Sequence, residues 1–211
     1  MTTARLFQFG EEMAEYPVRV LNEREARAGA GLLFLVASIA FVRAMGFGDF
    51  TLTRVVILGF FLEFAIRVLP NPRSAPSPVI GRLIVGRQEP EYVGAPQKRF
   101  AWALGLAMAT AAMVLVFGLN MAGPALMLLC VTCLALLFME TAFGICVGCK
   151  LFALIAREKA QMCPGGVCSF GGPAPITRVT SGHVVAVAAV AAVLAAALPA
   201  ILAMEQPWMP E

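Results

Sequence analysis

Five runs of apolar residues, each close to the length that crosses a lipid bilayer, constrain the fold of this chain most strongly. A hydrocarbon core of about 30 Å requires roughly 20 residues of helix. Because backbone polar groups must pair with one another inside lipid, each run is predicted to be a helix. We therefore expect an all-α integral membrane protein with five transmembrane helices, at residues Ala28–Met45, Thr51–Leu69, Ala101–Leu119, Ala122–Ile145 and Val184–Met204.

The composition excludes two other classes of protein. The chain is 60% hydrophobic and only 14% charged, which is not the composition of a soluble domain with a single core. Its basic residues lie at the ends of the apolar runs and form no patch, so nucleic-acid binding is not expected. The partner that the composition does predict is membrane lipid.

The spacing of the runs predicts how the helices are arranged. Short turns join the first four runs into two tandem helical hairpins, which favours a four-helix bundle with a peripheral fifth helix. The fourth run stays apolar as far as Ile155, which is too long for one span. We therefore predict a bend, or an exit from the membrane, near Gly144 or Gly148.

Four segments follow from this arrangement. Residues 1–27 are amphipathic and are predicted to form a helix on the cytoplasmic membrane surface, broken at Pro17. Residues 28–158 form the four-helix membrane bundle. A Cys/Gly/Pro-rich cytoplasmic loop follows at residues 159–182, and residues 183–211 supply the fifth transmembrane helix with an outer tail.

The positions of Lys and Arg predict the orientation. Thirteen of these 16 residues lie before the first run, between the second and third, or after the fourth. The positive-inside rule places these three segments in the cytoplasm. We expect a protein of the bacterial inner (cytoplasmic) membrane, with its N-terminus in the cytoplasm and its C-terminus in the periplasm. Cytoplasmic thiols stay mostly reduced, which disfavours a permanent disulfide there.

Four cysteines gather where the fourth run gives way to the charged loop. Thiolates are both nucleophiles and soft metal ligands, so the cluster suits redox chemistry, sulfur transfer or metal binding. A structural zinc held by four thiolates is one of these alternatives. The single histidine could join the cluster as base or ligand, although a polar residue at the membrane interface is the commoner role. The residues concerned are Cys146, Cys149, Cys163, Cys168 and His183.

Two Cys-x-x-Cys pairs share the same spacing but differ in their surroundings. Cys130 and Cys133 lie among leucines in the middle of a run, where small residues usually pack one helix on another. Cys146 and Cys149 lie at the membrane edge, beside Lys150 and a predicted helix break. A cation or a helix N-terminus lowers the pKa of a thiol. We predict that the second pair is functional and open to thiol reagents, and that the first is inert.

Two glutamates lie inside apolar runs, where an ionisable group is costly and indicates function. Arg67 follows Glu63 by four residues and is predicted to pair with it on one helical face. Glu140 does not share a face with Cys146 on an unbroken helix, so direct chemistry between them needs a kink at Gly144. Glu63, Arg67 and Glu140 are predicted to line a polar pocket for a small anionic sulfur species or a quinone head-group. A purely structural ion pair is the alternative.

Three segments together resemble a bacterial inner-membrane family known as a domain of unknown function. They are Val20–Gly31, Gln97–Ala101 and Glu140–Phe152, within a resemblance that covers roughly residues 18–170. The resemblance implies a small helical membrane protein, similar in layout to the four-helix DoxX-like proteins linked with sulfur and thiol metabolism. The motif positions carried over are Glu140, Gly144, Cys146, Gly148 and Cys149.

Two hypotheses remain, and neither decides whether the chain is an enzyme. The first is a membrane thiol protein that handles electrons or sulfur through Cys146 and Cys149, with Cys163 and Cys168 as the resolving or exchange pair. A thioredoxin-like protein would be its partner. The second is a non-enzymatic accessory subunit that binds other membrane-protein subunits, with cysteines that hold zinc or only pack. A transporter is less favoured, because five spans would have to oligomerise to form a path.

Overall fold

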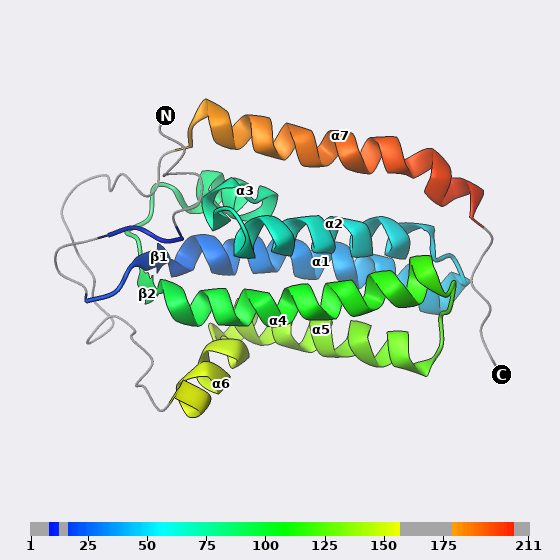
Figure 1. Ribbon diagram of the computed structural model, residues 1–211, viewed down its shortest axis with the longest axis horizontal. Helices are drawn as coiled ribbons and strands as arrows, with labels where there is room; N and C mark the ends of the chain where they lie inside the picture. The colour runs from blue at the N-terminus through cyan, green and yellow to red at the C-terminus, as the bar shows by residue number, and fades with distance from the viewer. Residues whose placement is uncertain (1–8, 13–16, 157–178, 205–211) are drawn as a thin grey trace.

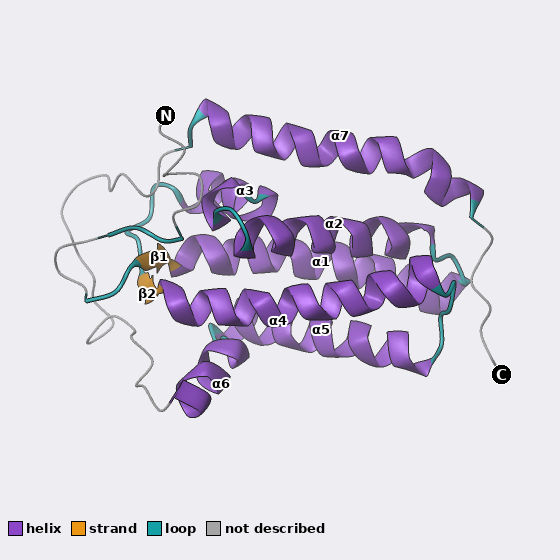
Figure 2. Cartoon of the chain, in the orientation of Figure 1, coloured by secondary structure: helices purple, strands orange, loops and turns teal. Residues whose placement is uncertain are grey.

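The computed structural model describes residues 9–12, 17–156 and 179–204, and this part of the chain is mainly helical (Figures 1 and 2). Five helices are long: α1 (Glu23–Phe47), α2 (Thr51–Val68), α4 (Ala95–Met113), α5 (Pro124–Phe143) and α7 (Ser181–Ala203). The short elements are α3 (Pro76–Val85), α6 (Val147–Ala156), the 3₁₀ turn η2 (Pro72–Ser74), the π-helical turn η3 (Val114–Gly118), β1 (Val20–Asn22) and β2 (Tyr92–Gly94).

The long helices lie side by side, with both short helices at the end that carries β1 and β2 (Figure 1). Helix α1 packs against α2, α3 and α5, and α4 packs against α2, α5 and α6, whereas α7 covers α2 and α3. The larger hydrophobic core lies between α1, α2, α4 and α5 and includes Ala30, Phe64, Trp102 and Leu137. We call the end with β1 and β2 the strand end.

Four helices in the described ranges are long and apolar enough to cross a membrane: α1, α4 together with η3, α5 and α7. Helix α2, predicted as the second span, is not among them. It carries Arg54, Glu63 and Arg67, all of which its neighbours bury. The all-α class is therefore confirmed, and the apolar helices are compatible with a membrane protein in contact with lipid.

The described part of the segment before α1 differs from the predicted surface helix, whose residues 1–8 and 13–16 lie outside the described residues. Val20–Asn22 forms the strand β1, which pairs antiparallel with β2 so that Leu21 faces Val93. Glu11 adds an isolated bridge to Val20. The backbone N–H and C=O groups of a strand pair with a second segment, which can be far along the chain, whereas those of a helix pair within the helix itself. Helix α1 then begins at Glu23, earlier than expected, because the Asn22 side chain accepts a bond from the backbone N–H of Arg24 and caps the helix.

The predicted break after the fourth run lies at Gly144. Helix α5 ends at Phe143, and Gly144 adopts a left-handed conformation with φ 65°. The backbone N–H of Gly144 bonds to the carbonyl of Glu140, which is the pattern of an αL cap, and that of Ile145 bonds to the carbonyl of Met139. This cap turns the chain sharply into α6 beside α4 (Figure 1).

Candidate functional site

The Cys146–Cys149 pair lies at this turn. Cys146 immediately precedes α6, and its carbonyl accepts the first helical bond from the backbone N–H of Lys150 at 3.1 Å. Cys149 is one turn further along, and its Sγ lies 2.7 Å from Sγ of Cys146. Both are free thiols. A disulfide needs about 2.05 Å between the sulfurs, so a small movement would join them.

The two thiols have different electrostatic surroundings. A hydrogen bond donated by the Cys149 thiol lowers the pKa of Cys146, and the charge of Lys98 adds to this effect against the opposing effect of burial. The same hydrogen bond, together with burial, raises the pKa of Cys149. Cys146 is therefore the residue that becomes a thiolate, and Cys149 is the thiol that donates to it. This asymmetry suits a nucleophile with a resolving partner.

Neither sulfur is as open as the position at the membrane edge suggested. The exposed fractions of Cys146 and Cys149 are 6% and 1%. The neighbouring helix α4 covers them, because Gly148 lets α6 approach it closely. A Cβ atom at Gly148 would lie 2.6 Å from Cβ of Ala101. The expectation of ready access to thiol reagents is corrected, because both thiols are buried.

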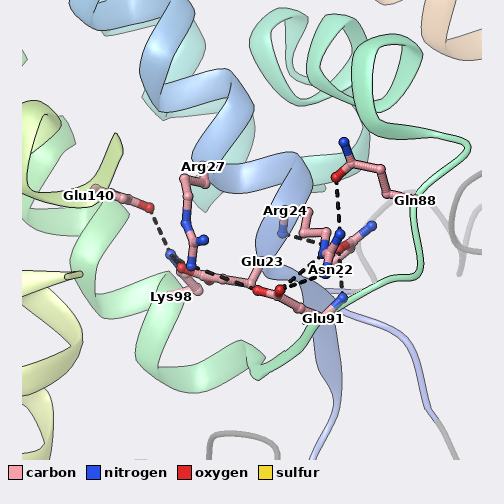
Figure 3. A network of polar contacts seen from close by, with 8 residues as sticks. All are labelled: Asn22, Glu23, Arg24, Arg27, Gln88, Glu91, Lys98 and Glu140. Atoms are coloured by element: carbon pink, nitrogen blue, oxygen red, sulfur yellow. Dashed lines mark hydrogen bonds and ion pairs between the residues drawn. The ribbon is translucent and has the colours of Figure 1, made fainter. Parts of the chain in front are cut away.

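The cation beside the sulfurs is Lys98, whereas the sequence had suggested Lys150, which is exposed. The Lys98 side chain is fully buried at the start of α4, and its Nζ lies 2.7 Å from Oε1 of Glu140 (Figure 3). On its other side, Nζ lies 2.8 Å from Oε2 of Glu23. Lys98 thus joins the starts of α1 and α4 to the end of α5.

A second group of polar side chains lies on one side of this trio, beside Glu23 (Figure 3). Arg24 donates from Nε to Oε1 of Glu91 at 3.0 Å and from Nη1 to Oε1 of Gln88 at 3.1 Å. Arg27 lies against Gly144, where a Cβ atom would meet its guanidinium at 2.7 Å. The left-handed turn and the arginine therefore both require glycine at this position.

Sequence reasoning missed Glu23, Arg27 and Lys98 as members of the site. In the sequence, Lys98 lies in the segment Gln97–Ala101 and indicates only which side of the membrane faces the cytoplasm. Its pairing with Glu140 joins residues 42 apart in the chain. A basic residue next to an apolar run was the only signal, and the same signal marks an ordinary residue at the membrane interface.

A cavity of about 320 Å³ lies between α1, α2, α4 and α5. Cys146, Glu140 and Arg67 line it at the strand end, and the rest of its wall is almost entirely apolar. Cys149 and Glu63 are not among its lining residues. The predicted polar pocket is therefore corrected to a mainly apolar cavity with a few polar groups at one end.

The predicted Glu63–Arg67 pair is present. Arg67 Nε donates to Oε1 of Glu63 at 2.8 Å, and both side chains are buried. Ser77 bonds both partners, since its hydroxyl donates to Oε1 of Glu63 at 2.7 Å and contacts Nη2 of Arg67. The guanidinium also lies over the rings of Phe64 and Trp102, 5.3 and 5.0 Å from their centroids. Arg67 is thus held from several sides while it lines the cavity.

The remaining predicted site residues lie apart from this site or outside the described residues. His183 starts α7, where its Nδ1 lies 3.2 Å from Nη1 of Arg82 in α3. Helix α7 is on the opposite side of the long helices from α6 (Figure 1), so His183 does not join the Cys146–Cys149 pair. Cys163 and Cys168 lie outside the described residues. Within the described ranges, no three metal-binding side chains gather.

Cys130 and Cys133 lie in α5, each partly buried against one of the two hydrophobic cores. They make packing contacts, as the sequence predicted, and they also line the cavity.

A family model matches residues 21–157. The chain belongs to the family described as Domain of unknown function (DUF4395). The matched region contains β1, the four helices around the cavity, and α6 with both thiols, and it ends before α7. No curated protein and no solved structure gives a significant match. This DUF4395 domain therefore includes the whole cavity and the Cys146–Cys149 pair.

Proposed function

We propose that this chain is an integral membrane thiol protein that transfers electrons through Cys146 and Cys149. The observation that carries the proposal is the asymmetric pair, with its sulfurs 2.7 Å apart at the start of α6. The buried ammonium of Lys98 lies close enough to favour a thiolate at Cys146. Cys130 and Cys133 have the same spacing but pack against the hydrophobic cores, which fits a packing role.

The proposed reaction is thiol–disulfide exchange. The Cys146 thiolate attacks one sulfur of a partner disulfide, and the leaving sulfur takes a proton. Cys149 then loses its proton and attacks Sγ of Cys146, which releases the second partner thiol. The partner gains two electrons and two protons, and the Cys146–Cys149 pair becomes a disulfide. Cys163 and Cys168, or a thioredoxin-like protein, are the proposed exchange partners.

We further propose that the chain crosses the bacterial inner membrane five times. Helices α1, α2, α4 and α5 form a four-helix bundle in this proposal, and α7 is peripheral. Helix α2 is the fourth member because its charged side chains are buried and so need not face lipid. Glu63 and Arg67 contact Ser77 of α3, and Arg67 also lies over Trp102 of α4. The distribution of Lys and Arg supports a cytoplasmic strand end.

The proposal is tested by redox titration of the full chain in nanodiscs. Samples equilibrated with mixtures of reduced and oxidised glutathione are alkylated, and mass spectrometry counts the free thiols at each position. We expect a reversible Cys146–Cys149 disulfide with a potential above about −300 mV, since lower values are typical of structural disulfides. The matched control is the Cys130–Cys133 pair, which should stay reduced. A Cys146–Cys149 pair that never oxidises would contradict the proposal.

The same sample separates the redox function from the zinc-binding accessory subunit. A structural zinc bound through Cys146, Cys149, Cys163 and Cys168 would copurify in equal amount with the chain. It would also protect these thiols from alkylation until a chelator is added. For the redox function, we expect alkylation of Cys146 to be independent of chelator.

A further inference from the structure

The cavity between the four helices has no role in exchange between two proteins, yet it leads to the nucleophilic thiol. Its volume of about 320 Å³ falls within the range of about 300–1,000 Å³ that is typical of small-molecule sites. Cys146 lines it, whereas the resolving Cys149 is not among its lining residues. A molecule inside the cavity would therefore meet the thiolate first.

The shape of the cavity excludes a small anion as its natural occupant. Leu126 and Glu140 both line it and are separated by 14 residues of α5, which corresponds to about 21 Å at 1.5 Å per residue. Most of this length is walled by apolar side chains such as Ala37, Ile57 and Met108. A small sulfur oxyanion would lose its hydration along such a wall without compensating hydrogen bonds.

Polar groups are confined to the strand end. Arg67 and Glu140 line the cavity there together with Cys146. The Arg67 guanidinium is fixed by Glu63 and Ser77, and Lys98 lies behind Glu140. A ligand that fits must have a long apolar part and a compact polar end that accepts hydrogen bonds and electrons.

We propose that this cavity binds a membrane quinone with an apolar tail, which accepts the two electrons of the Cys146–Cys149 pair. The inference rests on the proposed thiol chemistry: a partner dithiol reduces the pair by the reverse of the exchange described above, and the quinone is the acceptor that oxidises it again. The quinone ring lies at the strand end beside Cys146 and Arg67, and the tail extends between the helices towards Leu126.

The redox step balances as follows in atoms and electrons. The Cys146 thiolate adds to a ring carbon, and the displaced electron pair moves to a ring oxygen, which takes one proton. Cys149 then loses its proton and attacks Sγ of Cys146, so that the S–S bond forms and the S–C bond breaks. The released electron pair stays on the ring, and the second oxygen takes the second proton. The dithiol is oxidised to a disulfide, and the quinone is reduced to hydroquinone.

The test is a single turnover without oxygen, using the reduced full chain in nanodiscs and decylubiquinone as the probe. We expect one hydroquinone for each Cys146–Cys149 disulfide that forms. The same ring without its tail should react at least about 100-fold less efficiently, because each buried CH₂ group contributes about 0.8 kcal/mol, or roughly fourfold in affinity. This comparison needs no variant. Equal efficiency of both quinones would overturn the inference.

A pair of variants then tests the cavity itself. Ala37→Phe fills the cavity from α1, and Val36→Phe adds the same ring on the outer face of that helix, where Val36 is 45% exposed. We expect Ala37→Phe to reduce turnover with decylubiquinone at least about tenfold, without changing the redox potential of the Cys146–Cys149 pair. Val36→Phe should leave both unchanged.

The outcomes separate the two proposals. If oxidised glutathione oxidises the pair reversibly but decylubiquinone does not, the cavity holds a lipid acyl chain or another apolar molecule. The quinone inference is then wrong, and the thiol function stands. If neither oxidant forms the disulfide, the thiol function fails and the quinone inference fails with it.

Discussion

The ammonium of Lys98 lies 2.7 Å from the carboxylate of Glu140, within the interior at the strand end. A second carboxylate, that of Glu23, lies on its other side. Removing Lys98 alone would leave two carboxylates in a region that excludes water. The same ammonium is the cation beside Cys146, so this contact connects the stability of the fold with the reactivity of the thiols.

The first prediction concerns stability. Lys98→Met should lower the free energy of unfolding by about 3–5 kcal/mol, because it leaves the buried carboxylates of Glu23 and Glu140 without the ammonium that lies between them. Thermal unfolding in detergent measures the loss. The control is Lys150→Met, which removes an exposed lysine close to the same cysteines and should have little effect. Equal losses for the two variants would show that the buried network does not stabilise the fold.

The second prediction concerns the pH dependence of alkylation at Cys146. Its lowered pKa means that the thiolate is present at lower pH than in a free cysteine, whose pKa is about 8.5. The rate of reaction with N-ethylmaleimide should therefore reach its plateau at lower pH than the rate for free cysteine. Lys98→Met should shift the profile to higher pH, and Lys150→Met should not. An unchanged profile in both variants would remove Lys98 from the site.

The third prediction compares single and double variants of the Glu63–Arg67 pair. Arg67→Met leaves the Glu63 carboxylate buried with Ser77 as its remaining donor, and should cost about 3–5 kcal/mol. The double variant Glu63→Gln/Arg67→Met removes both charges and keeps an acceptor for Ser77, so it should cost less. Unfolding temperatures in detergent give the comparison. A loss in the double variant as large as the sum of the losses in Arg67→Met and Glu63→Gln would mean that the two residues act independently.

The fourth prediction concerns the close approach of α6 to α4. Gly148→Ala should destabilise the fold by about 1–3 kcal/mol, because its new methyl group would overlap Ala101. The matched control is Gly46→Ala in α1, where nothing lies within 4 Å of the added Cβ. That variant should be neutral or stabilise the helix by about 0.5–1 kcal/mol. If Gly148→Ala changed neither the stability nor the redox potential of the Cys146–Cys149 pair, that result would contradict the tight packing of α6 against α4.

The fifth prediction concerns orientation in the membrane. Reporter fusions after Glu211 should show alkaline-phosphatase activity and no cytoplasmic-reporter activity, because the positive-inside rule places the C-terminus in the periplasm. Fusions within residues 159–182 should give the opposite pattern. A C-terminal fusion with only cytoplasmic-reporter activity would reverse the proposed topology or change the number of spans.

Several features of this protein could be predicted from local sequence. The helical class follows from the length of the apolar runs, since lipid leaves backbone groups no other partners. The break near Gly144 follows from an apolar run too long for one span. The Glu63–Arg67 pair follows from a spacing of four residues, because such residues share a helical face. Each of these features depends on residues that lie within a few helical turns of one another in the sequence.

The tertiary structure decided what lies beside the thiols. Lys98 reaches Glu140 and Cys146 only because α4 packs against both α5 and α6, and nothing in the spacing of these residues indicates that packing. His183 was a candidate member of the cysteine cluster, with a polar role at the membrane interface favoured, and it lies with Arg82 because α7 packs on α2 and α3. The strand β1 also depends on a distant partner, β2. Contacts between distant segments depend on how whole helices pack, so the cavity and the cation at its end could be found only in the folded chain.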